Sequence, residues 1–249
     1  FRQFRAYKPL FAEKYVQRKI QKHLRKSPIK NVIVDFNSAE SLRLTSPSPE
    51  ALVDAQQQIT TLEDKFLKEY LAEQFYHQFV THNNEQGIKP DHARIANSSV
   101  DVLLPTKSII LETVSIRNIR RVTNYVLGFV QSIPYSTLES RLSSSGAGFN
   151  VPAKVLWENQ GDCDSKMTLT ATILRSLMPR IAMVLVYIDS HAFIGINVLP
   201  EGEDITIDVD GMTFVLADPT GPGKIPLGTI SFDSEQAVLS GHYSAELFN

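Results

Sequence analysis

The chain has 249 residues, of which 43% are hydrophobic and 21% charged, and this composition is ordinary for a globular protein with one large domain or one domain and an extension. No stretch approaches the roughly 18 consecutive apolar residues of a membrane span, and no signal peptide is recognisable. The first residue is Phe rather than Met, which predicts a processing boundary with room for a leader or an anchor upstream.

The formal net charge of −2 conceals a strong asymmetry along the chain. Residues 1–30 contain ten Lys or Arg and a single acid, Glu13, which gives this arm a charge of +9 and leaves −11 on the remainder. Apolar residues recur at roughly helical spacing from Phe4 to Leu24, a pattern that predicts an amphipathic helix with a solvated basic face. Such a face could bind anionic lipid or nucleic acid, or pack on the acidic body. The acidic body and the lack of a recognised nucleic-acid motif argue against nucleic acid.

The first half of the chain reads mainly as helix. A short strand is expected at 31–36, followed by a polar, Pro-containing loop at 37–49. Ser48-Pro49-Glu50 then opens a helical pattern that predicts one long helix over 50–82. Pro90-Asp91 and Pro105 read as breaks, and a further helix is expected over 107–132. Residues 143–149 (SSSGAGF) read as a flexible loop.

The second half changes character. A helix is expected from about Asp162 to Met178, and Pro179 ends it. Four strands are then expected in quick succession, with Asp210-Gly211 as the two-residue turn between the last two; they are 181–188, 191–198, 205–209 and 212–217. A helix followed by an antiparallel meander predicts an α+β fold rather than alternating βαβ units. The expected organisation is a basic arm and loop at 1–49, a helical extension at 50–115 and a core at 116–249.

The only cysteine, Cys163, stands at the expected start of a helix. A lone cysteine is usually a small buried apolar residue, so its neighbourhood has to argue for chemistry. Gly161 breaks the preceding structure and Asp162 is a suitable N-cap. The helix dipole and the free N–H groups at this position favour a thiolate, whereas Asp162 and Asp164 oppose it, so activation requires a basic partner.

His191 is the candidate for this basic partner, because it opens one of the expected strands. Asp218 follows a later strand, before Pro219, where an acid is well placed to orient an imidazole. Taken singly, His191 reads as an ordinary strand residue and Asp218 as a turn former; the conjunction with Cys163 makes the three a candidate catalytic triad. Asp204, Asp208 and Asp210 faintly resemble a calcium loop, but the later Glu that such a loop needs is missing. No zinc spacing is present, so no metal site is predicted.

Three segments in order resemble the transglutaminase-like superfamily: Gly161-Asp162-Cys163, His191-Ala192 and Asp218-Pro219-Thr220. Phe129 to Tyr135 also resembles the helix and Tyr-bearing turn that precede the cysteine in bacterial members, and the likeness covers about residues 116–230. The resemblance implies a papain-like fold, in which the cysteine helix packs on an antiparallel sheet that carries the His and the Asp. Members often have Gly after the cysteine helix where this chain has Met178-Pro179-Arg180, a departure that bears on substrate choice.

The resemblance implies a thiol acyl-transfer enzyme that needs no cofactor and acts on a peptide or protein. Cys163 would attack an amide carbonyl, His191 would carry the proton and Asp218 would hold the imidazole tautomer. Backbone N–H groups at the helix start, with Gln160 as a side-chain donor, would hold the oxyanion. Trp157 and Tyr135 are candidates for lining the cleft, with an ordinary core role as the alternative.

Three readings of function remain open at this stage. Resolution of the acyl-enzyme by water gives a peptidase or amidase, which bacterial relatives favour; resolution by an amine gives a crosslinking transglutaminase. The third is a binding module on the same fold without catalysis, with the helix at 50–82 as its interface. The resemblance also implies a bacterial envelope protein, membrane-associated or periplasmic, although a basic flank beside an anchor would favour the cytoplasmic face.

Overall fold

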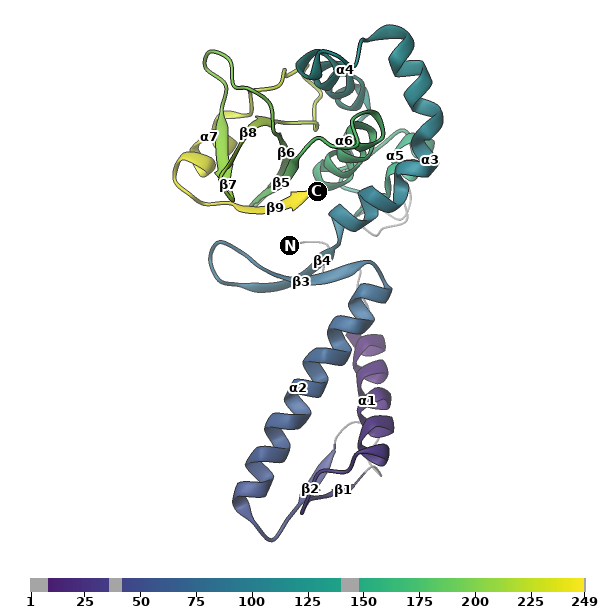
Figure 1. Cartoon of the computed structure of the whole chain (residues 1–249), viewed down its shortest axis with the longest axis vertical. Helices are drawn as coiled ribbons and strands as arrows, with labels where there is room; N and C mark the ends of the chain where they lie inside the picture. The colour runs from purple at the N-terminus through teal and green to yellow at the C-terminus, as the bar shows by residue number, and fades with distance from the viewer. Residues whose placement is uncertain (1–8, 36–41, 140–147, 249) are drawn as a thin grey trace. The chain divides into compact units, whose positions relative to one another are not determined.

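The computed structural model describes residues 9–35, 42–139 and 148–248, and the chain forms two compact units that meet in sequence at Gln78 and Phe79 (Figure 1). This boundary falls inside the segment 50–115 that the sequence groups as one extension. The reason is that α2 (Pro49–Glu73) packs on α1 (Pro9–Lys26) in the smaller unit, whereas α3 (His92–Thr113) packs on α6 (Cys163–Leu177) in the larger.

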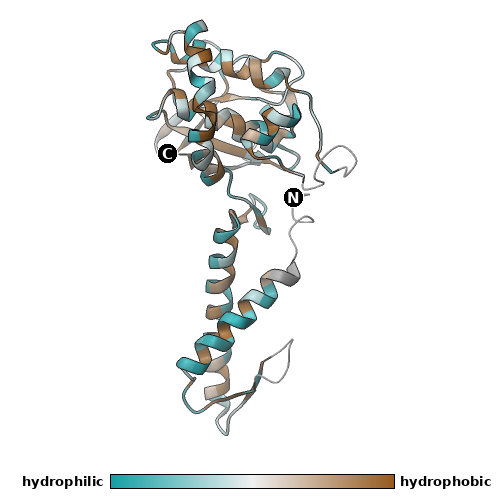
Figure 2. Ribbon diagram, turned by 90° about the vertical axis from the view of Figure 1, so that its right-hand side faces the viewer, coloured by the Kyte–Doolittle hydropathy of each residue, from teal (hydrophilic) through white to brown (hydrophobic). Residues whose placement is uncertain are grey.

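The smaller unit is a helix pair with a two-stranded antiparallel sheet, β1 (Ile33–Asp35) and β2 (Arg43–Thr45). The buried side chains of α1 recur every four residues, so they form one stripe along the helix; they are Ala12, Val16, Ile20 and Leu24. Val16, Ile20 and Leu24 share a core with Ala55, Ile59 and Phe66 of α2. Figure 2 shows the complementary hydrophilic faces of these helices. The predicted amphipathic helix in the basic arm is confirmed over the described residues.

The long helix predicted over 50–82 is shorter than expected. Ser48 caps α2, with its Oγ accepting a hydrogen bond from Ala51 N at 3.3 Å, but the helix ends at Glu73. Phe75 has a φ of 60°, a left-handed conformation that terminates a helix, and Tyr76–Val80 forms strand β3. Tyr, Phe and Val of this strand suit an extended backbone. It pairs with β4 (Gln86–Pro90) in a two-stranded sheet.

The larger unit is built around an antiparallel five-stranded sheet in the order β7-β8-β6-β5-β9. Its strands are β5 (Met183–Ile188), β6 (His191–Ile196), β7 (Thr206–Val209), β8 (Met212–Ala217) and β9 (Ser244–Phe248). Alternate residues of β5, β6 and β8 enter different cores. Met183, Leu185 and Ile194 pack with α3, α4 (Ile119–Ser132) and α6, whereas Val184 and Phe193 pack with α7 (Phe232–Leu239). Figure 1 shows α7 on the opposite side of the sheet from α6. The α+β class is therefore confirmed.

Helix α6 is the centre of the larger unit, because nearly all its side chains from Ser165 to Leu177 are buried. A helix buried on every side is normally apolar throughout, yet this one contains three fully buried threonines. Each hydroxyl donates to the carbonyl four residues earlier, from Thr168 to Asp164, Thr170 to Lys166 and Thr172 to Thr168, at 2.7–2.9 Å. The polar groups are thus satisfied within the helix.

The segment before the core also differs from the prediction. One helix was expected over 107–132, with a break at Pro105; instead α3 continues through Pro105 to Thr113 and α4 begins only at Ile119. The interruption is set by Asn118, whose side chain accepts from Arg121 N at 2.9 Å and caps α4. Helix α5 (Pro152–Glu158) follows the predicted loop at 143–149, most of which lies outside the described residues.

The predicted hairpin is confirmed: Asp210 and Gly211 both have positive φ values, 49° and 77°, between β7 and β8. The calcium-loop reading has no support, because two of the three carboxylates have other partners. Asp204 accepts hydrogen bonds from both Nη atoms of Arg120, at 3.3 and 2.6 Å, and Asp208 accepts one from Thr213. In the described part of the chain no cluster of three metal-ligating side chains occurs, and no helix there combines the length and apolarity needed to cross a membrane.

Candidate active site

Cys163 is the first residue of α6, as the sequence predicts, and its thiol is half-buried. Asp162 caps the helix, because its Oδ1 accepts from Ser165 N at 3.0 Å. Gly161 sits tightly in front of it: a Cβ at this position would lie 3.3 Å from Val155 Cγ1 and from Ser165 Cβ. The close approach and the cap together fix where the thiol leaves the helix.

Two neighbours contact the thiol directly. The thiol donates to Asp164 Oδ1 at 3.7 Å, and the backbone N–H of Ala192, next to His191, favours its ionised form. Burial raises the pKa of Cys163 well above its ordinary value, and the charges of Asp164 and Asp162 raise it further. The resting site therefore holds a neutral thiol at neutral pH.

The imidazole of His191 and the carboxylate of Asp218 form the clearest polar pair of the site. His191 Nε2 lies 2.9 Å from Asp218 Oδ2, with side chains 19% and 8% exposed. The two strands bring them together, since β6 pairs with β8 in the register Ile194 to Ala217. Burial opposes ionisation of Asp218, but the bonds from His191 and from Thr220 N outweigh it, and the pKa of Asp218 is lowered.

Because Asp218 remains ionised at neutral pH, it accepts a hydrogen bond from the N–H at His191 Nε2. The neutral imidazole then carries its free lone pair on Nδ1, which is the nitrogen able to take a proton from a nucleophile. In the described residues the thiol donates to Asp164 rather than to this ring. The direct Cys163–His191 hydrogen bond that the sequence predicts thus stays a prediction, for a state in which catalytic contacts tighten around substrate.

Two buried side chains that sequence reasoning missed hold the Asp218 segment in place. Gln131 Nε2 on α4 donates to Asp218 O and to Ile225 O, both at 2.8 Å. Lys166 on α6 donates to Ile133 O and to Thr220 O. A lysine among the small and apolar residues of a helix was the available signal for Lys166; a glutamine next to the last residue of α4 gave none.

The predicted cleft residues differ in their surroundings. Tyr135 forms an isolated parallel bridge with Gly161, and Ser136 N donates to Gly161 O at 3.1 Å, so Tyr135 lies beside the segment that leads into Cys163. It is 53% exposed, and Trp157, on α5, is 90% exposed. Neither is a core residue. Gln160 is half-buried, and its Nε2 lies 3.4 Å from Glu158 Oε2, a weak contact. The oxyanion role of its amide stays a prediction.

Comparison with known protein families, with curated proteins and with solved structures finds no match to this chain. The chemistry of the site must therefore be argued from its own geometry. That geometry comprises a thiol at a helix start, a strand N–H beside it, and a carboxylate that fixes the tautomer of a nearby imidazole.

Proposed function

We propose that this chain is a thiol acyl-transfer enzyme with a transglutaminase-like, papain-like core, and that it hydrolyses amide or peptide bonds through Cys163, His191 and Asp218. One observation supports it most strongly, the 2.9 Å bond between His191 Nε2 and Asp218 Oδ2 at the strand start that also contacts the thiol. A carboxylate that holds one tautomer of an imidazole is the arrangement that a general base requires.

In the proposed reaction, Cys163 Sγ attacks the amide carbon while its proton passes to His191 Nδ1. The carbonyl electrons move to oxygen, where N–H groups at the start of α6 stabilise the oxyanion. Collapse breaks the C–N bond, and the imidazolium returns the proton to the departing amine. Water, deprotonated by His191, then attacks the thioester, which releases a carboxylic acid and restores the thiol.

The neutral resting thiol favours this order of events. Because burial and two carboxylates raise the pKa of Cys163, a preformed thiolate is not available, and proton transfer must accompany the attack. The proposed enzyme thus depends on His191 as a general base. A binding module would have no requirement for this arrangement.

The test is profiling of the whole chain against a peptide-amide library, with and without an added primary amine. We expect hydrolysis by the native protein and none by Cys163→Ala or His191→Ala, with the folds verified by circular dichroism. Amine incorporation faster than hydrolysis would identify a crosslinking transglutaminase instead. Absence of any turnover, with a thiol that is alkylated only after denaturation, would favour the non-catalytic binding module and overturn the proposal.

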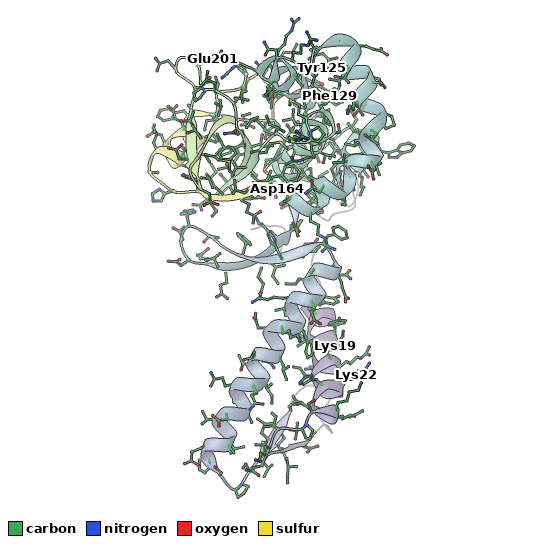
Figure 3. All side chains as sticks on the ribbon, viewed as in Figure 1. Lys19, Lys22, Tyr125, Phe129, Asp164 and Glu201 are labelled. Carbon is green, nitrogen blue, oxygen red and sulfur yellow. The ribbon has the colours of Figure 1, made fainter. Side chains whose placement is uncertain are left out.

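A second role, at the membrane surface, is favoured by the smaller unit. Basic residues of α1 recur every three or four positions opposite its buried stripe, at Lys14, Arg18, Lys22 and Arg25, and all are exposed. Figure 3 shows Lys22 directed away from α2. The apolar face of α1 is already buried, so attraction to anionic lipid would be electrostatic, about 1 kcal/mol for each basic residue near the surface.

Co-sedimentation with vesicles tests this role. We expect binding to vesicles containing phosphatidylserine, loss of binding to neutral vesicles, and release by high salt. Replacement of Arg18, Lys22 and Arg25 by Gln should weaken binding while hydrolysis is unchanged. Equal binding to duplex DNA would contradict the lipid assignment, and binding that survives high salt would contradict the electrostatic one.

A further inference from the structure

A second carboxylate, Asp164, contacts the thiol, and a second imidazole, His92, lies beside that carboxylate. Neither belongs to the His191–Asp218 pair. Asp164 Oδ1 accepts from Cys163 Sγ at 3.7 Å, and its other oxygen, Oδ2, lies 3.9 Å from Nε2 of His92. His92 begins α3 and is fully buried. Its Nδ1 lies 3.0 Å from Thr168 Oγ1, one turn further along α6. Figure 3 marks Asp164 among the side chains of the larger unit.

The hydrogen bonds of Thr168 determine the protons on His92. The Thr168 hydroxyl gives its only proton to the carbonyl oxygen of Asp164, at 2.7 Å, so toward His92 it can only accept. His92 Nδ1 must therefore carry a proton. In a neutral ring Nε2 would then present a lone pair to the Asp164 carboxylate, which is repulsive. A proton on Nε2 would turn this repulsion into the attraction of an ion pair.

An imidazolium beside the Asp164 carboxylate is therefore the arrangement that avoids this repulsion, as an ion pair at 3.9 Å. The pair is then neutral overall, although it is buried. A neutral pair costs much less to bury than an isolated charge, which accounts for a histidine with no exposure at this position.

We propose that His92 and Asp164 form a second, proton-holding pair that keeps the Cys163 thiol protonated and oriented in the resting site. They are positioning residues rather than catalytic ones: Asp164 receives the thiol hydrogen until substrate arrives, and His92 compensates the charge of Asp164. The inference rests on the proposed function only in taking Cys163 as the nucleophile.

Other charged groups also face this pair, and their effects must be kept constant in any test. Lys89 on β4 lies 2.9 Å from Glu246 on β9, and its Nζ is 3.3 Å from the centre of the Tyr187 ring on β5, itself 5.9 Å from the His92 ring. Asp91 precedes His92, and Asp162 precedes the thiol. These groups remain in place when only Asp164 or His92 is replaced.

The proposal predicts opposite effects for the two members of the pair. Asp164→Asn removes a negative charge beside the thiol, so alkylation of Cys163 by iodoacetamide at neutral pH should accelerate about tenfold, because the thiolate is the reacting species. His92→Gln leaves Asp164 uncompensated, so alkylation should slow several-fold. Loss of a merely structural contact would shift both variants in one direction.

The experiment measures alkylation rates of the full chain across neutral and alkaline pH for both variants. Asp208→Asn, the same change at an exposed site on β7, is the control and should match the native rate. Nitrogen-15 spectra of the His92 ring should show both nitrogens protonated at neutral pH, and should lose this signature in Asp164→Asn even if His92→Gln does not fold. Shifts of the same sign, or a neutral His92 ring, would overturn the proposal.

These outcomes are independent of turnover. If no substrate is hydrolysed but the two variants move alkylation in opposite directions, the pair is established while the proposed function fails. If hydrolysis requires Cys163 and His191 but neither variant alters alkylation, the proposed function stands and the second pair is rejected.

Discussion

The two units of the chain bury different chemistry. In the described part of the smaller unit, every buried side chain is apolar, as in the stripe from Ala12 to Leu24. In the larger unit the buried set includes ionisable side chains; they are Lys89, His92, Asp162, Lys166 and Asp218. Burying such groups costs free energy unless each is paired, so their concentration in the larger unit marks the start of α6 as the candidate functional site.

The same contrast appears in how charge is used. The basic residues of α1 are exposed at regular spacing, where solvent screens them and each contributes little to stability. Around Cys163, a few charges act at short range in partly desolvated surroundings. The smaller unit is therefore expected to tolerate substitutions that the larger one does not. Three variants of the larger unit test this difference.

The largest effect is expected for Asp218→Asn. Its Oδ1 can still accept from Thr220 N, but the new amide N–H would donate to His191 Nε2 and leave the proton on Nδ1, the wrong tautomer for a base. We expect hydrolysis to fall on the order of 10- to 1,000-fold in kcat/KM while the fold is retained.

The control for this change is Asp208→Asn, which should stay fully active. Steady-state kinetics of both proteins decide the matter. An Asp208→Asn variant that loses as much as Asp218→Asn, or an Asp218→Asn variant with native activity, would remove Asp218 from the triad.

A smaller effect, on stability, is expected for Lys166→Met. The variant leaves Ile133 O and Thr220 O without their buried ammonium donor, which should lower the free energy of unfolding by about 2–4 kcal/mol. Lys68→Met in the smaller unit is the matched control, since Lys68 pairs with Asp64 and both side chains are more than half exposed. Urea unfolding should show a change within about 0.5 kcal/mol there. Equal losses of unfolding free energy in Lys166→Met and Lys68→Met would contradict the proposed difference between the two units.

A further effect concerns the pH dependence of stability. Burial, together with the charge of Asp164, raises the pKa of Asp162 to about 7. The folded chain therefore holds this proton at pH values where the unfolded chain has released it. Stability from this group is complete below the unfolded pKa and is lost as pH rises toward 7, by about 1.4 kcal/mol for each pH unit that separates the folded and unfolded pKa values.

Asp162→Asn should remove this pH dependence, because Asn caps a helix as well as Asp does. Thermal unfolding measured at mildly acidic and at neutral pH gives the comparison. We expect the variant to gain most over the native protein at neutral pH. A gain that is equal at both pH values would refute the assignment to Asp162.

Features with local causes could be predicted from the sequence. The turn at Asp210-Gly211 and the start of α6 after Asp162 each depend on a few adjacent residues. The proximity of His191 and Asp218 was also inferred, because both stand at strand ends in a short meander. The end of α2 was missed, since a left-handed Phe75 has no signal in side-chain periodicity.

Contacts between distant segments could not be predicted. His92 lies 76 residues from Thr168, and Gln131 is 87 residues from Asp218, so no spacing rule connects them. From the sequence, Asp164 could be interpreted only as a charge that opposes a thiolate, because its partner His92 on α3 was unknown. The components of the candidate triad thus had sequence signals, whereas the residues that surround and position them required the fold.

Strand β9 has a further consequence for the fate of the chain after damage. It covers the edge of β5, whose sequence Met183–Ile188 (MVLVYI) carries no charge. Glu246 of β9 forms an ion pair with Lys89 and accepts a hydrogen bond from Tyr187, and Phe248 O accepts one from Arg175. Proteolytic removal of β9 would uncover a strongly β-forming, uncharged edge with unpaired N–H and C=O groups. A clipped molecule would then be a template for aggregation through this edge.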